Sequence, residues 1–329
     1  MMRKTLASLL FAIGSLGLQN EAYSQAVGNI YVADNKPVVH EISDLYSNGC
    51  DYVHEFFTLV GDNPDPKQMA FSPWNNNLFI AQRGQNRVCE YHGETGDLLR
   101  EIVLPNKTYG VAFGSDKNLY VSNGDVGLGE VYKFDGNSGE HLGVFVPNSR
   151  NGGLNDPHAL TFGRDDNLYV SSSQTPIGVF KYDGKTGEVM EPVPFTHGGP
   201  PDPGTIEFIA FGPNGNLFLT DDTTKVFEYD SQSGLFLGLF VNDTNIRLEG
   251  IVFREDGDLI AINQNGDVRI YDGDTGDYAG GGCSGYVRRP IGVAIKPEIG
   301  KPRGDWNKDG DVDLDDYEAF WNCAQISGP

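Results

Sequence analysis

The chain has 329 residues and a formal net charge of −22 at pH 7, from 46 acidic and 24 basic side chains. This charge argues against binding to nucleic acids and to anionic membrane surfaces, because both reward Lys and Arg. The length allows one large domain or two smaller ones.

The N-terminus has the composition of an export signal. Residues 1–4 are positively charged, residues 6–18 form an apolar run that is short for a membrane span, and Ala22 and Ala26 lie near a plausible cleavage point. We therefore predict a signal peptide over residues 1–26 and a mature protein that is secreted or held in the cell envelope. An uncleaved anchor is the alternative, and no later segment is apolar for long enough to cross a membrane.

Four cysteines are spread widely along the chain. In an exported protein they could form two disulfides, in any of three connectivities, or remain partly as free thiols. None belongs to a C-x-x-C pair, so a zinc ribbon or a redox motif is not indicated. The residues are Cys50, Cys89, Cys283 and Cys323.

Two short motifs recur along the chain and define an internal repeat. The first is an Asn-Leu strand start, at Asn77, Asn118, Asn167 and Asn216, with weaker copies at Asn29 and Asp258. The second is a turn of the form aromatic-Asp-Gly-x-Thr/Ser-Gly, which begins at Tyr91, Phe134, Tyr182, Tyr229 and Tyr271. Gly supplies positive φ in such turns. The spacing of about 41 to 49 residues is that of four-stranded propeller blades.

Each copy also contains an apolar inner strand. These strands read MAF, GVAF, ALTF, FIAF, GIVF and GVAI. The inner strand at 292–295 has no second strand after it, and the second strand at 29–33 has no inner strand before it. We therefore expect both to belong to one blade, which closes an all-β, six-bladed β-propeller over residues 27–300 and removes the open edge.

One repeat carries a family resemblance. Residues 77–91, NLFIAQRGQNRVCEY, resemble the "gNLYVaDsgNnRVqvf" unit of NHL-repeat proteins. The resemblance implies a six-bladed group that includes sugar lactonases of the gluconolactonase type, streptogramin lyases and non-catalytic binding proteins. The fold therefore leaves the function open.

A different motif occupies residues 301–329. In GDWNKDGDVDLDDYEAFWNCA, oxygen-bearing side chains alternate as in a calcium loop, with Gly310 at the sharp turn and an apolar helix expected afterwards. The predicted calcium ligands are Asp305, Asn307, Asp309, Asp313 and Asp316, together with the backbone carbonyl of Asp311.

The last position of this loop is Asp316, where a standard EF-hand has Glu. In this respect the loop is similar to the calcium repeats of dockerin modules, which implies a cohesin-like protein partner. A full dockerin has two such repeats and this sequence shows one. We therefore predict calcium binding by this loop, with docking to a protein partner as a further prediction and a solvated acidic tail as the alternative.

The mouth of the propeller channel is the expected place for a ligand. The residues four positions before the end of each inner strand are Lys67, Tyr109, His158, Glu207, Glu249 and Ile291. In gluconolactonase-like proteins this position supplies metal ligands. His158, Glu207 and Glu249 come from three successive blades and could bind a divalent metal or act as acid and base. The alternative is a hydrated polar channel lining.

These observations lead to two predicted functions. The first is a secreted, monomeric, calcium-binding propeller that acts as a binding module for an extracellular protein or glycan. The second is a metal-dependent extracellular lyase or lactonase in which His158, Glu207 and Glu249 are catalytic. The sequence has no G-x-S-x-G, P-loop or H-E-x-x-H motif that would indicate another enzyme class.

Overall fold

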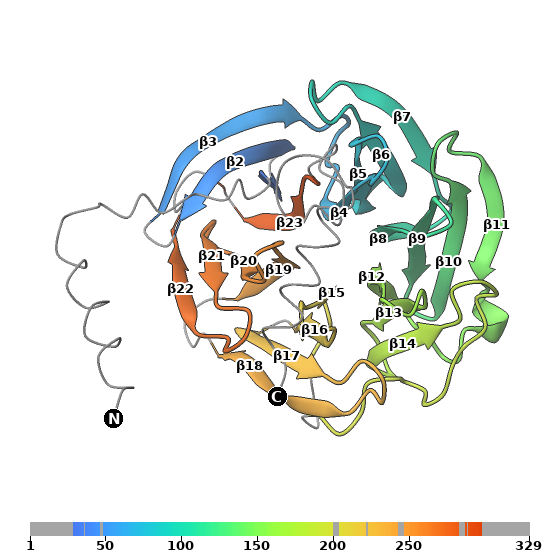
Figure 1. The fold of residues 1–329 in the computed structure, drawn as a ribbon. Coiled ribbons are helices and arrows are strands. Elements are labelled where there is room, and N and C mark those ends of the chain that lie inside the picture. Colours follow the sequence, from blue (N-terminus) through green and yellow to red (C-terminus); the bar gives the residue numbers. More distant parts are fainter. Residues whose placement is uncertain are drawn as a thin grey trace, which may run out of the picture.

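The computed structural model describes residues 29–297, except residues 36, 47–48, 200–203, 222, 243–246, 283–286 and 288, and only the backbone of residues 44–46 and 49–52. Within this part, six antiparallel sheets are arranged as blades around a central channel (Figure 1). The prediction of an all-β, six-bladed propeller is confirmed. The predicted signal peptide and calcium loop lie outside the described residues.

The blades are numbered along the chain, and their strands are given from the channel outward. Blade 1 contains β23 (Pro290–Ile295), β1 (Ile30–Asp34), β2 (Val38–Tyr46) and β3 (Gly49–Thr58); blade 2 contains β4 (Pro66–Phe71), β5 (Leu78–Gln82), β6 (Arg87–Tyr91) and β7 (Leu98–Val103). Blade 3 contains β8 (Lys107–Phe113), β9 (Asn118–Asp125), β10 (Leu128–Asp135) and β11 (His141–Val146).

The remaining three blades follow the same order. Blade 4 contains β12 (Pro157–Phe162), β13 (Leu168–Ser172) and β14 (Gly178–Tyr182); blade 5 contains β15 (Phe208–Phe211), β16 (Leu217–Thr220), β17 (Lys225–Tyr229) and β18 (Phe236–Asn242). Blade 6 contains β19 (Leu248–Phe253), β20 (Leu259–Asn263), β21 (Val268–Tyr271) and β22 (Tyr278–Gly281). Two short 3-10 turns, η1 (Arg83–Gln85) and η2 (Asn148–Arg150), lie between strands.

The ring closes through blade 1, as the sequence predicts. β23 pairs antiparallel with β1, with Ile295 opposite Ile30 and Ala294 opposite Tyr31. The Lys296 amide extends this ladder by donating a hydrogen bond to the Asn29 carbonyl at 3.1 Å. Because the first and last strands share one sheet, the inner edge of β1 is paired within the chain.

The core lies between neighbouring blades. One cluster joins Ile30 and Val32 of blade 1 to Ile260 and Ile262 of blade 6, and the other blade pairs share similar clusters. All five residues of β1, β5, β13 and β20 are buried, because a neighbouring blade covers each face. This explains why the second strands read as continuous apolar runs and not as alternating ones.

The repeated Asp-Gly turns have the geometry that the sequence predicts. In the turn after β10, Asp135 Oδ1 accepts hydrogen bonds from the backbone amides of Asn137 at 3.0 Å and Ser138 at 2.6 Å. These bonds lower the pKa of the Asp135 carboxyl. Gly139 has a φ of +72°, a conformation that favours glycine, and the glycines of the equivalent turns have similar values.

Blade 4 departs from the expected four strands, since three are present in its described residues. A loop containing Pro192 and Pro194 occupies the place of the outer strand. Prolines lack the amide that a ladder needs, so this segment cannot form a regular strand. Its Phe195 amide still donates to the Val179 carbonyl of β14 at 2.8 Å, which satisfies part of the outer edge.

Of the two alternatives for the four cysteines, two disulfides or partly free thiols, the structure supports partly free thiols. Cys89 is a free thiol in the interior of β6, and the side chains of the other three cysteines lie outside the described residues. Burial raises the pKa of the Cys89 thiol to about 11, so the thiol is protonated and unreactive at neutral pH.

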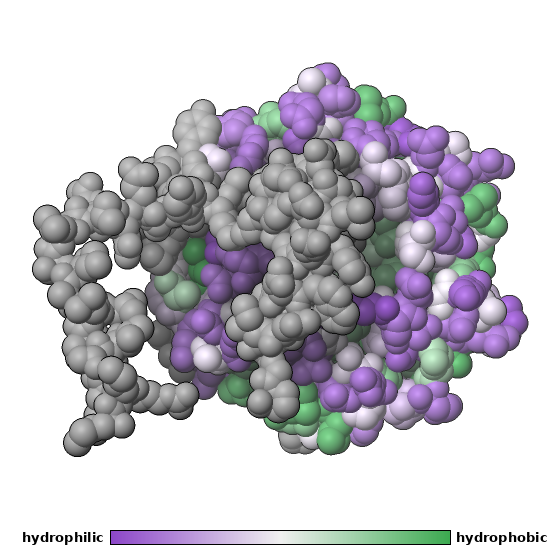
Figure 2. Space-filling view, viewed as in Figure 1, coloured by the Kyte–Doolittle hydropathy of each residue, from purple (hydrophilic) through white to green (hydrophobic). Residues whose placement is uncertain are grey.

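The outer surface is polar, in agreement with the net charge. Figure 2 shows a face that is predominantly hydrophilic, with separate apolar patches near the rim. Leu99 on β7 and Leu142 on β11 are among the exposed apolar residues of the outer strands. No helix in the described ranges has the length and apolar character needed to cross a membrane.

Candidate functional site

A β-bulge near the start of the inner strands shapes the channel mouth. In β4, β8 and β12 the register shifts between Pro66 and Met69, between Thr108 and Val111, and between Pro157 and Leu160. β19 and β23 show a shift at the equivalent place. A bulge inserts one extra residue and redirects a side chain. The predicted mouth positions Lys67, Tyr109, His158, Glu249 and Ile291 all fall in these bulges.

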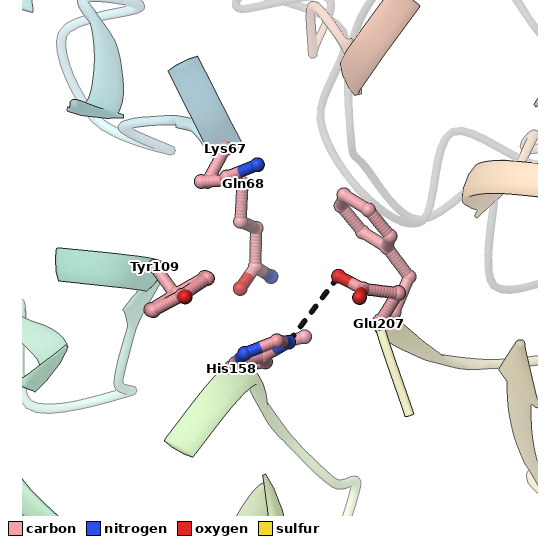
Figure 3. Close-up of a pocket in the computed structure, with 7 residues that line it drawn as sticks. Lys67, Gln68, Tyr109, His158 and Glu207 are labelled. Atoms are coloured by element: carbon pink, nitrogen blue, oxygen red, sulfur yellow. Dashed lines mark ion pairs between the residues drawn. The ribbon is translucent and has the colours of Figure 1, made fainter. Parts of the chain in front are cut away.

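Four of the six predicted mouth residues line one pocket. Lys67, Tyr109, His158 and Glu207 come from four adjacent blades and are arranged around a common space in Figure 3. The other lining residues are Gln68, Ala159 and Phe208. The pocket has a volume of about 180 Å³, including solvent at its opening. This is below the range of pockets that enclose a whole drug-sized ligand.

His158 is the most buried polar group of the mouth, with 6% of its surface exposed. Its ring stacks on that of Tyr109, with centroids 3.9 Å apart and an interplanar angle of 16°. Its Nδ1 atom lies 3.2 Å from Glu207 Oε2, and its Nε2 atom lies 3.9 Å from Asp156 Oδ2. The contact between Nδ1 and Glu207 is thus the closer of the two carboxylate contacts of this ring.

The Glu207 carboxyl is held in its ionised form. Burial by itself raises its pKa, but the contact with His158 and the positive charges of Lys67 and Arg247 outweigh burial and lower the pKa below its ordinary value. Glu207 is fixed by its backbone, because its amide donates to the Thr220 carbonyl at 3.1 Å immediately before β15.

The cations of the mouth are paired with Asp65. Lys67 Nζ lies 3.2 Å from Asp65 Oδ1, and Arg83 Nη1 lies 3.0 Å from Asp65 Oδ2. The Arg83 guanidinium also lies 4.9 Å from the centre of the Tyr109 ring, a cation–π distance. Burial raises the pKa of the Tyr109 hydroxyl, so the phenol is neutral.

Gln68 crosses the channel beneath these residues. Its Nε2 donates to the Leu160 carbonyl at 2.8 Å, and the Leu160 amide donates to its Oε1 at 3.0 Å. The two residues lie in blades 2 and 4. In blade 3 between them, a Cβ on Gly110 would lie 2.5 Å from the His158 carbonyl oxygen and 2.9 Å from Gln68 Oε1, so only glycine leaves room for this crossing.

Sequence reasoning missed three groups of the mouth: Gln68, Asp156 and Arg83. Gln68 is the second residue of the bulge that presents Lys67, so the bulge pattern could have found it. Asp156 precedes β12 with a φ of +50°, and its carbonyl accepts a 2.8 Å bond from Ser173 Oγ. Arg83 reaches the site from η1, between β5 and β6, where no repeated motif marks it.

Glu249 does not line the pocket. Its Oε1 atom lies 3.0 Å from Arg247 Nε, two residues earlier in the chain. Within the described residues, no three His, Cys, Asp or Glu side chains group closely enough to hold a metal ion. The structure thus brings His158 and Glu207 together, and it does not gather Glu249 with them into a metal-binding group. Ile291, the remaining mouth position, is apolar.

Comparison with known proteins identifies the fold. No protein-family model matches this sequence, and no curated protein matches it. A chain of a nidogen/laminin complex superimposes with a TM-score of 0.65 at 13% identity, covering 82% of this chain and 98% of that chain. A protein of unknown function from Bacteroides caccae superimposes with a TM-score of 0.60 at 11% identity, covering 82% and 100%. Identities this low establish a shared β-propeller fold alone. The resemblance to NHL-repeat proteins stays a prediction.

Proposed function

We propose that this protein is a binding module for an extracellular protein or glycan, with its ligand site in the mouth pocket. The observation that carries the proposal is the convergence of Lys67, Tyr109, His158 and Glu207, from four adjacent blades, on one pocket. Pockets that combine apolar walls with a few convergent polar groups are the usual form of ligand sites. One of the similar structures comes from a complex of two proteins, and this agrees with a binding role for such a ring.

The pocket residues are held in place without a ligand. Lys67 is paired with Asp65, Glu207 contacts His158, and the His158 ring is fixed by its stack on Tyr109. A ligand therefore meets side chains that are already ordered, which reduces the entropy lost on binding.

Binding to arrayed glycans and extracellular proteins tests the proposal. For the ligands that bind, Lys67→Ala and His158→Ala should weaken affinity about tenfold or more, since buried groups in a pocket commonly contribute at least this much. Lys185→Ala and His141→Ala are matched controls, because both residues are exposed and lie outside the pocket. Unchanged affinity in both pocket variants would place the binding surface elsewhere and overturn the proposal.

A catalytic role is the second candidate, and one observation favours it. His158 lies between two carboxylates, those of Glu207 and Asp156, as an imidazole that accepts and returns a proton often does. Incubation with sugar lactones and with substrates of β-elimination tests this role. Turnover that His158→Ala abolishes and His141→Ala preserves would favour the lyase or lactonase, whereas the binding module predicts no turnover.

Export and calcium binding complete the proposal. Their support is the signal-like residues 1–26 and the spaced oxygen ligands between Asp305 and Asp316. We predict that calorimetry detects calcium binding in the wild type and little or none in Asp305→Ala. The melting temperature of the propeller should change little on chelation, because β1 and β23 close the ring without this loop. Equal heats from both proteins would contradict the assignment.

A further inference from the structure

A second set of residues lies next to the mouth residues in the chain. These follow the mouth residues in each inner strand and are Gln68, Gly110, Ala159, Phe208, Gly250 and Gly292. A Cβ on Gly292 would lie 2.3 Å from the Lys67 carbonyl oxygen, so the backbones are already in close contact here. Of this set, Gln68, Ala159 and Phe208 line the pocket, and we call these three residues its floor.

This floor is suited to an apolar group. Ala159 and Phe208 contribute hydrocarbon, and both amide atoms of Gln68 are already engaged with the backbone of Leu160. A polar ligand group that reached the floor would lose its bonds to water and gain little in return. A methyl group would bury its surface there at no such cost.

The walls of the pocket are polar. They carry a hydrogen-bond donor, Lys67, on one blade and an acceptor, Glu207, on another. The Lys67 ammonium can only donate hydrogen bonds, and the ionised Glu207 carboxylate can only accept them. Lys67 is already paired with Asp65, and Glu207 contacts His158 and lies near the positive charges of Lys67 and Arg247. An ionic ligand would bring an extra charge into this paired set. The walls thus match an uncharged group that has one acceptor and one donor.

From these features we propose that the pocket binds the acetamido group of an N-acetylated amino sugar. Its carbonyl accepts from Lys67 Nζ, its N–H donates to Glu207, and its methyl group contacts Phe208 and Ala159. The acetamido group would enter between these side chains, and the sugar ring would stay at the opening of the pocket. This inference rests on the proposed function of the mouth pocket as a ligand site.

The surroundings of the opening favour a sugar over an acetylated lysine. Asp65 and Arg83 lie beside Lys67 and Tyr109, and both side chains are partly exposed. They offer acceptors and donors to the hydroxyl groups of a sugar ring. The stem of an acetyl-lysine is aliphatic and would leave these groups without matching contacts.

Ligand-observed NMR with N-acetylglucosamine as the probe tests the proposal. A monosaccharide of this size should bind with a Kd of about 1 mM. Glucose lacks the acetamido group and glucosamine replaces it with a charge, so both should bind at least about tenfold more weakly. Lys67→Met and Glu207→Gln should weaken binding of N-acetylglucosamine to a similar extent. The exposed Lys185→Met is the matched control and should leave it unchanged, and thermal unfolding shows that each variant is folded.

Other outcomes separate this inference from the function on which it rests. Binding of an acetyl-lysine peptide without binding of N-acetylglucosamine overturns the amino-sugar ligand. Equal binding of glucose and N-acetylglucosamine overturns the role of the acetamido group. If another arrayed glycan or protein binds in a Lys67-dependent manner while the probe does not, the inference fails and the binding module stands. If no ligand depends on the pocket, both fail.

Discussion

His158 shows how a single residue sets the chemistry of the mouth. An imidazole this deeply buried is tolerated because carboxylates and an aromatic ring surround it: Glu207 on one side, Asp156 on the other, and Tyr109 on its face. The same contact acts in return on Glu207 and favours its ionised form. The two residues are therefore coupled, and a change in one alters the other.

This coupling predicts a pH-dependent contribution of Glu207 to stability. Its pKa in the folded protein lies below its ordinary value of about 4.5, so the ionised carboxylate stabilises the folded state above that pH. The stabilisation is lost as the pH falls through the lowered pKa. The free energy of unfolding of the wild type should therefore exceed that of Glu207→Gln at pH 6, and this difference should shrink toward pH 3.

Urea unfolding of both proteins between pH 6 and pH 3 measures this difference. Glu188→Gln is the matched control, because Glu188 is exposed in the turn after β14, and its difference from the wild type should stay small throughout. A difference between Glu207→Gln and the wild type that did not vary with pH would contradict the coupling.

Residue positions at the mouth were predictable to the extent that they follow the repeat. The mouth position lies at a fixed distance from the end of each inner strand, so counting along the sequence found Lys67, Tyr109, His158 and Glu207, although β15 has no bulge at this place. Gln68 was missed because its partner Leu160 is 92 residues away in another blade. Glu249 was expected in the site, but Arg247 engages it locally, and a repeat pattern carries no information about such neighbours.

At the scale of elements, the Gln68 side chain is a cross-link between strands that are not neighbours in the ring. It joins β4 to β12 across the channel. β8 lies between these two strands in the ring and makes neither of the two hydrogen bonds. The strands of a propeller otherwise contact chiefly their own blade and the adjacent ones. This cross-link therefore fixes the spacing of blades 2 and 4 directly.

We predict that Gln68→Ala lowers the free energy of unfolding by about 2 to 4 kcal/mol, because it leaves two backbone groups of Leu160 without their partner. Urea or thermal unfolding measures the loss. Gln85→Ala is a matched control, since the Gln85 amide donates only an exposed bond to the Asp62 carbonyl, and it should cost less than about 0.5 kcal/mol. Equal losses in the two variants would show that the cross-link contributes nothing specific.

The repeat allowed the second strand of each blade to be predicted. It did not predict the number of strands in blade 4. The second strands were recognisable because burial on both faces requires unbroken apolar runs such as LFIAQ in β5. Blade 4 has the same spacing between repeats as blade 3 but lacks a described outer strand. The prolines at 192 and 194 could have indicated this, because they remove the amides that an outer strand uses.

For the molecule as a whole, closure through blade 1 is the decisive structural feature. Without β23, strand β1 would expose its inner edge and buried residues such as Tyr31 and Val32. Lys296 adds a further tie, because its Nζ donates to the Gly93 carbonyl in blade 2 at 2.9 Å. The last inner strand therefore joins its own blade to the next one.

A chain that ends at residue 297 should consequently unfold at nearly the same temperature as the full chain. A chain that ends at Gly281 lacks β23 and should lose more than about 5 kcal/mol, which is comparable to the total stability of many domains. It should show no cooperative melting transition in calorimetry. Cooperative melting of the shorter chain at the same temperature would mean that the ring does not need its closing strand.

The hydrogen bond from the Lys296 amide to the Asn29 carbonyl also means that the propeller fold does not require its chain ends at this position. Its two ends lie next to each other, so a linker of a few residues could join them and new termini could be opened elsewhere, for instance among the exposed residues near Arg150. Such a circular permutant keeps every blade and every inter-blade contact. The fold would then be defined by the order of the blades around the axis. The position of the chain ends would not matter to it.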